Sequence, residues 1–221
     1  PKPTARIRPT HLLAAQFGDQ AGAIGRAVDG LVVHHNDVSI GRAAKIQFDG
    51  RRTRLHTRFC GLVGVRYPIV QTGMGWVSGP ALTAATADAG GLGILAAAPL
   101  TFDQMVVAVD DVRGATDAPF GVNLRTDSDD VERRVEHLIA AEVPVVSFAQ
   151  APGRAMVVRL KEAGVVVIPT VGARRHAEKV AEWGVDAVIA QGAEGGGHTG
   201  VVPTSLLIPQ VLDAVDIPVV A

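Results

Sequence analysis

The chain has 221 residues and a net charge of −1, and 48% of its residues are hydrophobic. This composition predicts one or two domains with a sizeable core, and the charge argues against a nucleic-acid or membrane-surface partner. The single cysteine, Cys60, excludes an intramolecular disulfide and favours a cytoplasmic location. No apolar run approaches the roughly 20 residues of a membrane-spanning helix.

Charge is distributed unevenly along the chain. Residues 1–60 carry a net charge of +6 and the remaining residues carry −7. Residues 1–52 show weak periodicity and no motif, so we expect a basic, poorly ordered N-terminal extension. His34 and His35 are adjacent, and neighbouring side chains point in different directions, so we predict no metal site there.

From residue 53 onward, short apolar runs alternate with helical patterns. The runs are continuous rather than alternating, as in parallel strands that are covered on both faces. Helix starts are indicated by Ser78 as a cap before Pro80, and by Thr101 with Gln104 as a capping box. We predict strands at residues 67–71, 91–95, 119–124, 143–148, 165–169, 185–190 and 217–221. Helices are predicted after Ser78, Thr101, Ser128 or Asp129, Pro152, Ala173, and Thr204 or Ser205.

This repeated strand–helix pattern predicts an α/β fold. An open doubly wound sheet and a (β/α)8 TIM barrel both fit the pattern. A barrel requires eight strands, and the chain ends on its predicted seventh strand, so we expect residues 53–221 to form a barrel truncated after about that strand. Unpaired first and last strands would favour pairing with another chain, which makes a homo-oligomer a candidate state.

Both architectures place ligands at the C-terminal ends of the strands. Those positions carry small residues, amides and one histidine, and they contain no paired carboxylates, Cys/His cluster or nucleotide-binding loop. Small residues with amides suit a large flat ligand held by hydrogen bonds. The glycine-rich stretch Gln191–Gly200 contains His198, which can exchange protons near neutral pH. A loop that binds nothing is the alternative interpretation of this stretch.

Four separated motifs resemble the nitronate monooxygenase family, formerly called 2-nitropropane dioxygenases. They are Tyr67–Met74, Asp88–Leu95, Phe120–Leu124 and Ala190–His198, and the resemblance covers about Leu55 to Ala221. The resemblance implies an FMN-dependent (β/α)8 oxidoreductase that acts on a small-molecule substrate. Flavin-type enoyl-acyl-carrier-protein reductases are related to this family.

The resemblance also implies roles for individual residues. Met74 and Gly75 would lie against the flavin ring, Asn123 would hydrogen-bond the flavin or its ribityl chain, and Gln191 would contact the flavin. Gly196 would give the flavin room beside the backbone. The catalytic base would be His198, which would remove a proton α to an electron-withdrawing group while the flavin accepts electrons.

The first departure from the family pattern concerns two of its motifs, and it leaves the reaction open. The chain has Thr72-Gly73-Met74 and Gly195-Gly196-Gly197-His198 where enzymes with nitronate activity usually have Ala-Pro-Met and Ala-Gly-Gly-His. The version at Gln71–Trp76 resembles actinobacterial relatives linked to steroid-ring degradation, whose expected substrates are acyl-CoA thioesters. The family resemblance makes nitronate oxidation the first expectation. Oxidation or reduction of an acyl-CoA or enoyl thioester, with NADH or NADPH as a candidate partner, is the alternative.

The second departure is the end of the chain. The family's FMN-phosphate loops follow the seventh and eighth strands, whereas this chain stops at Pro218–Ala221. A truncated, non-functional fragment of such an enzyme is therefore a further alternative.

Overall fold

The computed structural model describes residues 32–34, 37–40, 44–49, 52–196 and 200–221. The chain divides into two compact units, Pro1–Leu55 and His56–Ala221. The first unit contains a four-stranded sheet with the order β1-β2-β3-β4. Its strands are β1 (Val32–His34), β2 (Asp37–Ile40), β3 (Ala44–Asp49) and β4 (Arg52–Thr57), and the β1–β2 and β2–β3 pairs are antiparallel.

The sequence analysis predicted no strand before residue 53. Strands of three or four residues are too short for their periodicity to be recognised, which explains why β1 and β2 were missed. The poor order expected for the extension, residues 1–52, stays a prediction, and residues 1–31 lie outside the described residues. His35 also lies outside them.

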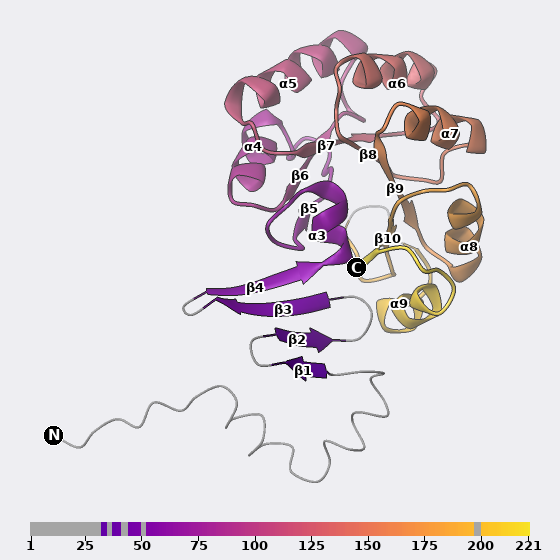
Figure 1. The fold of residues 1–221 in the computed structure, drawn as a ribbon. Coiled ribbons are helices and arrows are strands. Elements are labelled where there is room, and N and C mark those ends of the chain that lie inside the picture. The colour runs from indigo at the N-terminus through magenta and orange to yellow at the C-terminus, as the bar shows by residue number, and fades with distance from the viewer. Residues whose placement is uncertain (1–31, 35–36, 41–43, 50–51, 197–199) are drawn as a thin grey trace, which may run out of the picture. The chain divides into compact units, whose positions relative to one another are not determined.

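The second unit contains a parallel sheet whose seven strands follow one another in sequence order. The strands are β5 (Val70–Gln71), β6 (Leu92–Ala96), β7 (Phe120–Leu124), β8 (Val145–Phe148), β9 (Val166–Val171), β10 (Val188–Ala190) and β11 (Val219–Val220). A doubly wound sheet would reverse its strand order at a switch point, and this sheet does not. The barrel prediction is confirmed, with seven parallel strands in a nearly closed arrangement (Figure 1).

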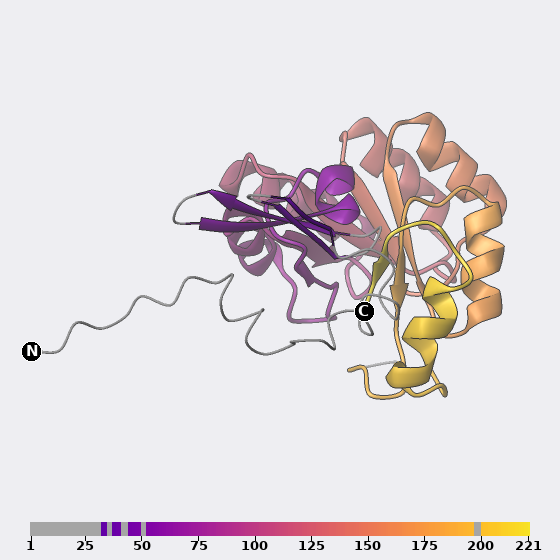
Figure 2. The same cartoon turned by 60° about the horizontal axis from the view of Figure 1, so that its bottom comes forward.

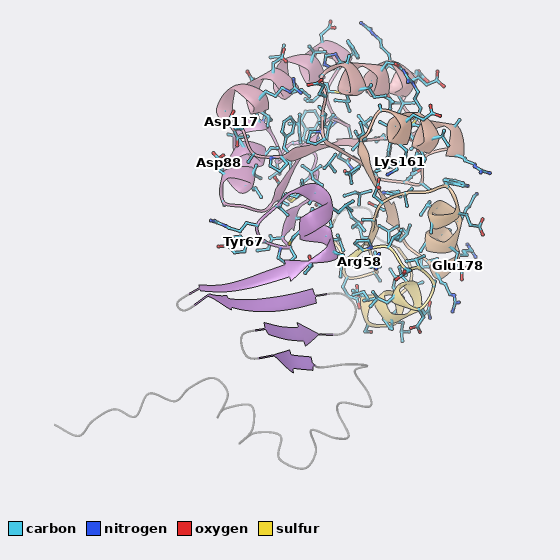
Figure 3. The ribbon with its side chains drawn as sticks, in the orientation of Figure 1. Arg58, Tyr67, Asp88, Asp117, Lys161 and Glu178 are labelled. Carbon is cyan, nitrogen blue, oxygen red and sulfur yellow. The ribbon has the colours of Figure 1, made fainter. Side chains whose placement is uncertain are left out.

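A helix follows each strand from β5 to β10 and covers the outside of the sheet (Figure 1). Figure 2 shows the later helices, in orange and yellow, on the outer side of the strands. Charged side chains such as Lys161 and Glu178 lie on this outer surface (Figure 3). The helices are α4 (Pro80–Asp88), α5 (Phe102–Ala115), α6 (Val131–Ala140), α7 (Arg154–Glu162), α8 (Arg174–Glu182) and α9 (Thr204–Leu212).

Two apolar clusters hold this unit together. The larger cluster lies between the strands and the outer helices, and it includes Leu95, Val122 and Leu160. The smaller cluster joins Leu92 and Ile94 of β6 to side chains of α3 (Arg58–Val63), the helix that precedes the first barrel strand. Alternate residues of β6 thus enter different clusters, as the two-residue period of a strand requires.

The predicted helix caps have mixed outcomes. The capping box of Thr101 and Gln104 is confirmed. The Ser78 cap is wrong, because α4 begins after Gly79 and has no side-chain cap. The Ser128 or Asp129 cap is also wrong. The N-cap position of α6 is occupied by Asp130, whose side chain makes no capping hydrogen bond.

Candidate active site

A cavity of about 1220 Å³ lies at the C-terminal ends of the strands. This is the edge where ligands bind in α/β barrels. Three residues that the sequence analysis singled out, Gly75, Asn123 and Gln191, come together in its wall from three different strand ends. The complete lining is Gly73, Gly75, Trp76, Ala98, Pro99, Asn123, Arg125, Thr126, Asp127, Ala149, Gln150, Ala151, Thr170, Gly172, Ala173, Arg175, His176, Gln191, Gly200, Val201 and Val202.

The other three candidate residues do not line this cavity. Met74 lies between the lining residues Gly73 and Gly75 in sequence, and its side chain is exposed. Gly196 is exposed, and its carbonyl oxygen accepts a hydrogen bond from Gln191 Nε2 at 2.9 Å. His198 lies outside the described residues.

The amide of Asn123 is fixed by two neighbours. Asn123 Nδ2 donates to Ser147 Oγ at 3.0 Å, and Ser147 is only 1% exposed. On its other side, an ideal Cβ on Gly73 would lie 2.4 Å from Asn123 Cβ, so only glycine fits at position 73. The sequence analysis missed Ser147. Its signal was a single polar residue within the apolar strand β8, in register with Asn123.

Ser78 organises the loop that follows β5. Its hydroxyl donates to Thr72 O at 2.9 Å and accepts from Met74 N at 2.9 Å and from Gln71 Nε2 at 2.8 Å. Ser78 is 1% exposed, so these bonds are shielded from water. A serine that was predicted to cap α4 instead fixes the loop containing Gly73, Gly75 and Trp76.

The glycine-rich loop after β10 is anchored at two points. Gln191 N donates to Val171 O at 3.0 Å, which ties the loop to the end of β9. The carboxylate of Glu194 accepts from Thr204 N at 2.7 Å and from Thr204 Oγ1 at 2.6 Å, which ties it to the start of α9. The Thr204 hydroxyl, followed by its N–H, holds the pKa of Glu194 below its usual value. Gly192 admits this approach, since an ideal Cβ there would lie 2.3 Å from Thr204 Oγ1.

Two arginines, Arg125 and Arg175, line the cavity. Arg125 Nε donates to Asp127 Oδ1 at 2.8 Å, and this hydrogen bond raises the pKa of Arg125 and lowers the pKa of Asp127. Arg175 also lines the cavity, and within the described part of the chain it forms no ion pair. Arg175 is therefore the cation available to an anionic group of a ligand.

The same cavity fits a flavin in size and in the chemistry of its wall. Gly73, Gly172 and Gly200 provide stretches of wall that have no side chain, against which a flat ring system can lie. Asn123 and Gln191 supply amide groups for hydrogen bonds. Across the described residues no group of three or more His, Cys, Asp or Glu side chains is placed to hold a metal ion. No described helix has the length and apolar character needed to cross a bilayer.

The nitronate monooxygenase family model matches residues 56–134 and 126–221, which together span the whole barrel unit. The chain belongs to the nitronate monooxygenase family. Enzymes of this family are flavin-dependent oxidoreductases, so the flavin and oxidoreductase expectations are confirmed at that level. The barrel, the cavity at its C-terminal edge and the family agree with one another.

Two similar curated proteins carry the same name, "(3aS,4S,5R,7aS)-5-hydroxy-7a-methyl-1-oxo-octahydro-1H-indene-4-carboxyl-CoA dehydrogenase". The one from Rhodococcus jostii is 59% identical over 167 residues, which is 76% of this chain and 47% of that protein. The one from Mycobacterium tuberculosis is 57% identical over 171 residues, which is 76% of this chain and 48% of that protein. The expected likeness to actinobacterial steroid-degradation enzymes is confirmed.

A similar solved structure is that of FabK from Thermotoga maritima. It is 40% identical to this chain and superposes with a TM-score of 0.72, covering 74% of this chain and 53% of FabK. The sequence comparison thus identifies the family, and the structure comparison shows the same barrel in FabK. The chain spans about half the length of the curated dehydrogenases that it matches.

Proposed function

We propose that this chain forms the flavin-binding part of an FMN-dependent oxidoreductase that acts on a coenzyme A thioester. The observation that carries this proposal is the 59% and 57% identity to two proteins named as carboxyl-CoA dehydrogenases. The thioester alternative of the sequence analysis is thereby better supported than nitronate oxidation, which was its first expectation.

The cofactor in this proposal is FMN, held in the large cavity. Asn123, oriented by Ser147, and Gln191 hydrogen-bond it, and Gly75 lies against its ring. Met74, which precedes Gly75 and is exposed beside the cavity, would contact the ring from the cavity's border. Gly196 leaves room beside the backbone. When bound, FMN supplies the two-electron acceptor of the reaction.

The proposed base is His198, which follows Gly196 by two positions in the glycine-rich loop. It takes a proton from the carbon α to the thioester carbonyl, where the electron-withdrawing carbonyl makes the proton acidic. The two electrons that FMN would accept leave with a hydrogen of the β carbon, and a double bond forms between the α and β carbons. His198 lies in sequence between Glu194 and Thr204, which are hydrogen-bonded to each other. The start of the loop is held by the bond from Gln191 N to Val171 O.

Arg175 is consistent with a thioester substrate. Coenzyme A carries several phosphate groups, and arginine pairs well with phosphate. Arg175 is available to such a phosphate, whereas Arg125 is already paired with Asp127. The location in the cytoplasm, a homo-oligomer and reduction by NADH or NADPH stay predictions.

The decisive experiment follows the flavin directly. The protein containing this chain is purified, its flavin is extracted and identified as FMN or another flavin, and the loaded protein is mixed without oxygen with cyclohexanecarboxyl-CoA or with propyl nitronate. We expect the visible absorbance of oxidised flavin to be lost with the thioester and to be retained, or lost far more slowly, with the nitronate.

A histidine pair separates the base from general effects of mutation. His198→Ala is expected to keep the flavin and lose at least a hundredfold in reduction rate, within the range for removal of a general base. His137→Gln is the matched control, because His137 packs against Phe102 outside the cavity. Wild-type reduction rates in His198→Ala, or reduction by the nitronate alone, would reject the proposal.

A further inference from the structure

Trp76 has an unusual backbone and an exposed side chain. Its φ is 66°, in the left-handed region that aromatic residues rarely adopt, and its side chain is 87% exposed. An exposed tryptophan gains no burial that would offset such strain. Residues held in strained backbone conformations cluster at ligand sites, so the position of Trp76 indicates a contact with a ligand.

The strain at Trp76 is imposed by the loop around it. Val77 N and Ser78 N both donate to Met74 O, at 3.1 Å and 2.9 Å, which closes a tight turn. The buried Ser78 hydroxyl holds the two ends of this turn through Thr72 O and Met74 N. The loop therefore fixes the backbone at Trp76, and the indole extends from it into solvent.

A second cavity, of about 570 Å³, lies beside Trp76. Its wall comes from the loop after β5, the end of β6 and a largely exposed flank of α5, and it includes Val77, Leu100 and Val107. The volume is within the range of about 300–1000 Å³ that is usual for small-molecule pockets. Trp76 and Pro99 line both this cavity and the large one, so the two cavities border each other at Trp76.

The two cavities differ in charge. The small cavity has the carboxylates Asp103 and Asp111 in its wall and no basic residue. The large cavity has Arg125, which is paired with Asp127, and Arg175, which forms no ion pair within the described part of the chain. A phosphate-bearing group is therefore repelled from the small cavity and attracted to the large one. The occupant suited to the small cavity is uncharged and mostly apolar.

We infer that the small cavity beside Trp76 binds the acyl group of the substrate, and that it accepts a bulky, uncharged carbocyclic acyl group. This inference rests on the proposed thioester function. The indole of Trp76 forms one wall of the acyl site at its border with the flavin cavity, and an aromatic face provides a large contact area at low entropic cost. The thioester carbonyl and the α carbon beside it then lie at this border, on the side of the flavin.

Binding is measured first, without turnover. The chain has two tryptophans, and Trp183→Phe leaves Trp76 as its only indole. Flavin-loaded Trp183→Phe protein is titrated with cyclohexanecarboxyl-CoA, acetyl-CoA and CoA. We expect the emission of the exposed Trp76 to shift to shorter wavelength with cyclohexanecarboxyl-CoA and to stay unchanged with CoA. An equal shift with CoA, or no shift with any ligand, would overturn the inference.

Two substitutions then test the shape of the pocket, with affinity measured by calorimetry. Trp76→Gly removes the wall and also relieves the positive φ, so it is expected to fold at least as stably as the wild type. Val107→Phe fills the cavity from α5, where Val107 is 59% exposed. Each should weaken cyclohexanecarboxyl-CoA at least fivefold and acetyl-CoA less than twofold. Val158→Phe on α7, which lines neither cavity, should change neither affinity.

Equal weakening of both thioesters by Trp76→Gly and Val107→Phe, or no weakening, would overturn the pocket assignment. The proposed function fails separately, because it is rejected when a bound thioester does not reduce the flavin. If a thioester binds tightly, depends on Trp76 for its affinity and leaves the flavin oxidised, the pocket assignment stands and the proposed reaction is rejected.

Discussion

Gly73 and Asn123 approach each other so closely that an ideal Cβ on Gly73 would lie 2.4 Å from Asn123 Cβ. The contact joins the loop after β5 to β7, and both residues line the large cavity. Asn123 cannot retreat freely, because its amide donates to the buried Ser147. The absence of a side chain at position 73 thus fixes the place of the amide at position 123.

Gly73→Ala is expected to displace Asn123 and to damage flavin binding. Forcing a methyl group into this contact should lower the free energy of unfolding by about 1–3 kcal/mol and reduce the flavin content of the purified protein. Chemical denaturation and flavin absorbance check both effects. Gly114→Ala is the matched control, since an ideal Cβ there meets nothing within 4 Å and α5 should tolerate alanine well. Unchanged flavin content in Gly73→Ala would contradict the assigned role of Asn123.

The barrel could be predicted from the sequence because its strands and helices are local patterns. The apolar run of β8 and the capping box at Thr101 each depend on residues close together in the chain. Strand order then follows from the short connections between neighbouring elements. The cavity was likewise predictable in outline, because residues that follow parallel strands gather at one edge of the sheet.

The contacts that shape the site could not be predicted in this way. Gly73 meets Asn123 fifty positions away, and Glu194 reaches Thr204 across a loop whose conformation no pattern specifies. Ser78 illustrates a different difficulty. A serine before a proline-started helix is a common cap, but its hydroxyl here bonds the backbone of the preceding loop, a competing use that sequence spacing does not distinguish.

Ser147→Ala tests whether the Asn123 amide needs its partner. The hydroxyl of Ser147 accepts from Asn123 Nδ2 at 3.0 Å, and its loss leaves a partly buried amide free to rotate. We expect the free energy of unfolding to fall by about 1 kcal/mol and the flavin dissociation constant to rise severalfold. A double-mutant cycle with Asn123→Ala measures the coupling. Additive effects on flavin binding would show that Ser147 does not act through Asn123.

Ser78→Ala should loosen the loop that holds Gly73 and Trp76. The substitution removes one donor bond and two acceptor bonds in a buried setting, so we expect a loss of about 2–3 kcal/mol in the free energy of unfolding. Hydrogen exchange at Met74 N should become faster, because this N–H loses the Ser78 hydroxyl and keeps only Thr72 O as its acceptor. Ser205→Ala, at an exposed serine on α9, is the control and should be neutral. Unchanged protection at Met74 N would contradict the role assigned to Ser78.

The contact between Glu194 and Thr204 should make the glycine-rich loop sensitive to acid. Because the pKa of Glu194 is lowered in the folded protein, its stabilising effect is fully present above the carboxyl group's unfolded pKa. The effect is lost as the pH falls through the lowered folded pKa, since the protonated carboxyl is a weaker acceptor for the Thr204 N–H. At neutral pH the anchor is therefore intact, and acidification should release it.

Amide exchange of Thr204, expressed as a protection factor at each pH, measures this anchor directly. We expect protection to fall on acidification in the wild type, and to be low and independent of pH over the same range in Glu194→Ala. Glu178→Ala is the control, because Glu178 pairs with Arg174 on α8 and does not contact α9's first residue. Since His198 lies in the anchored loop, Glu194→Ala should also slow flavin reduction while leaving flavin content near the wild-type level. Full Thr204 protection in Glu194→Ala would show that the loop is held by its backbone bond between Ala193 N and Val202 O instead.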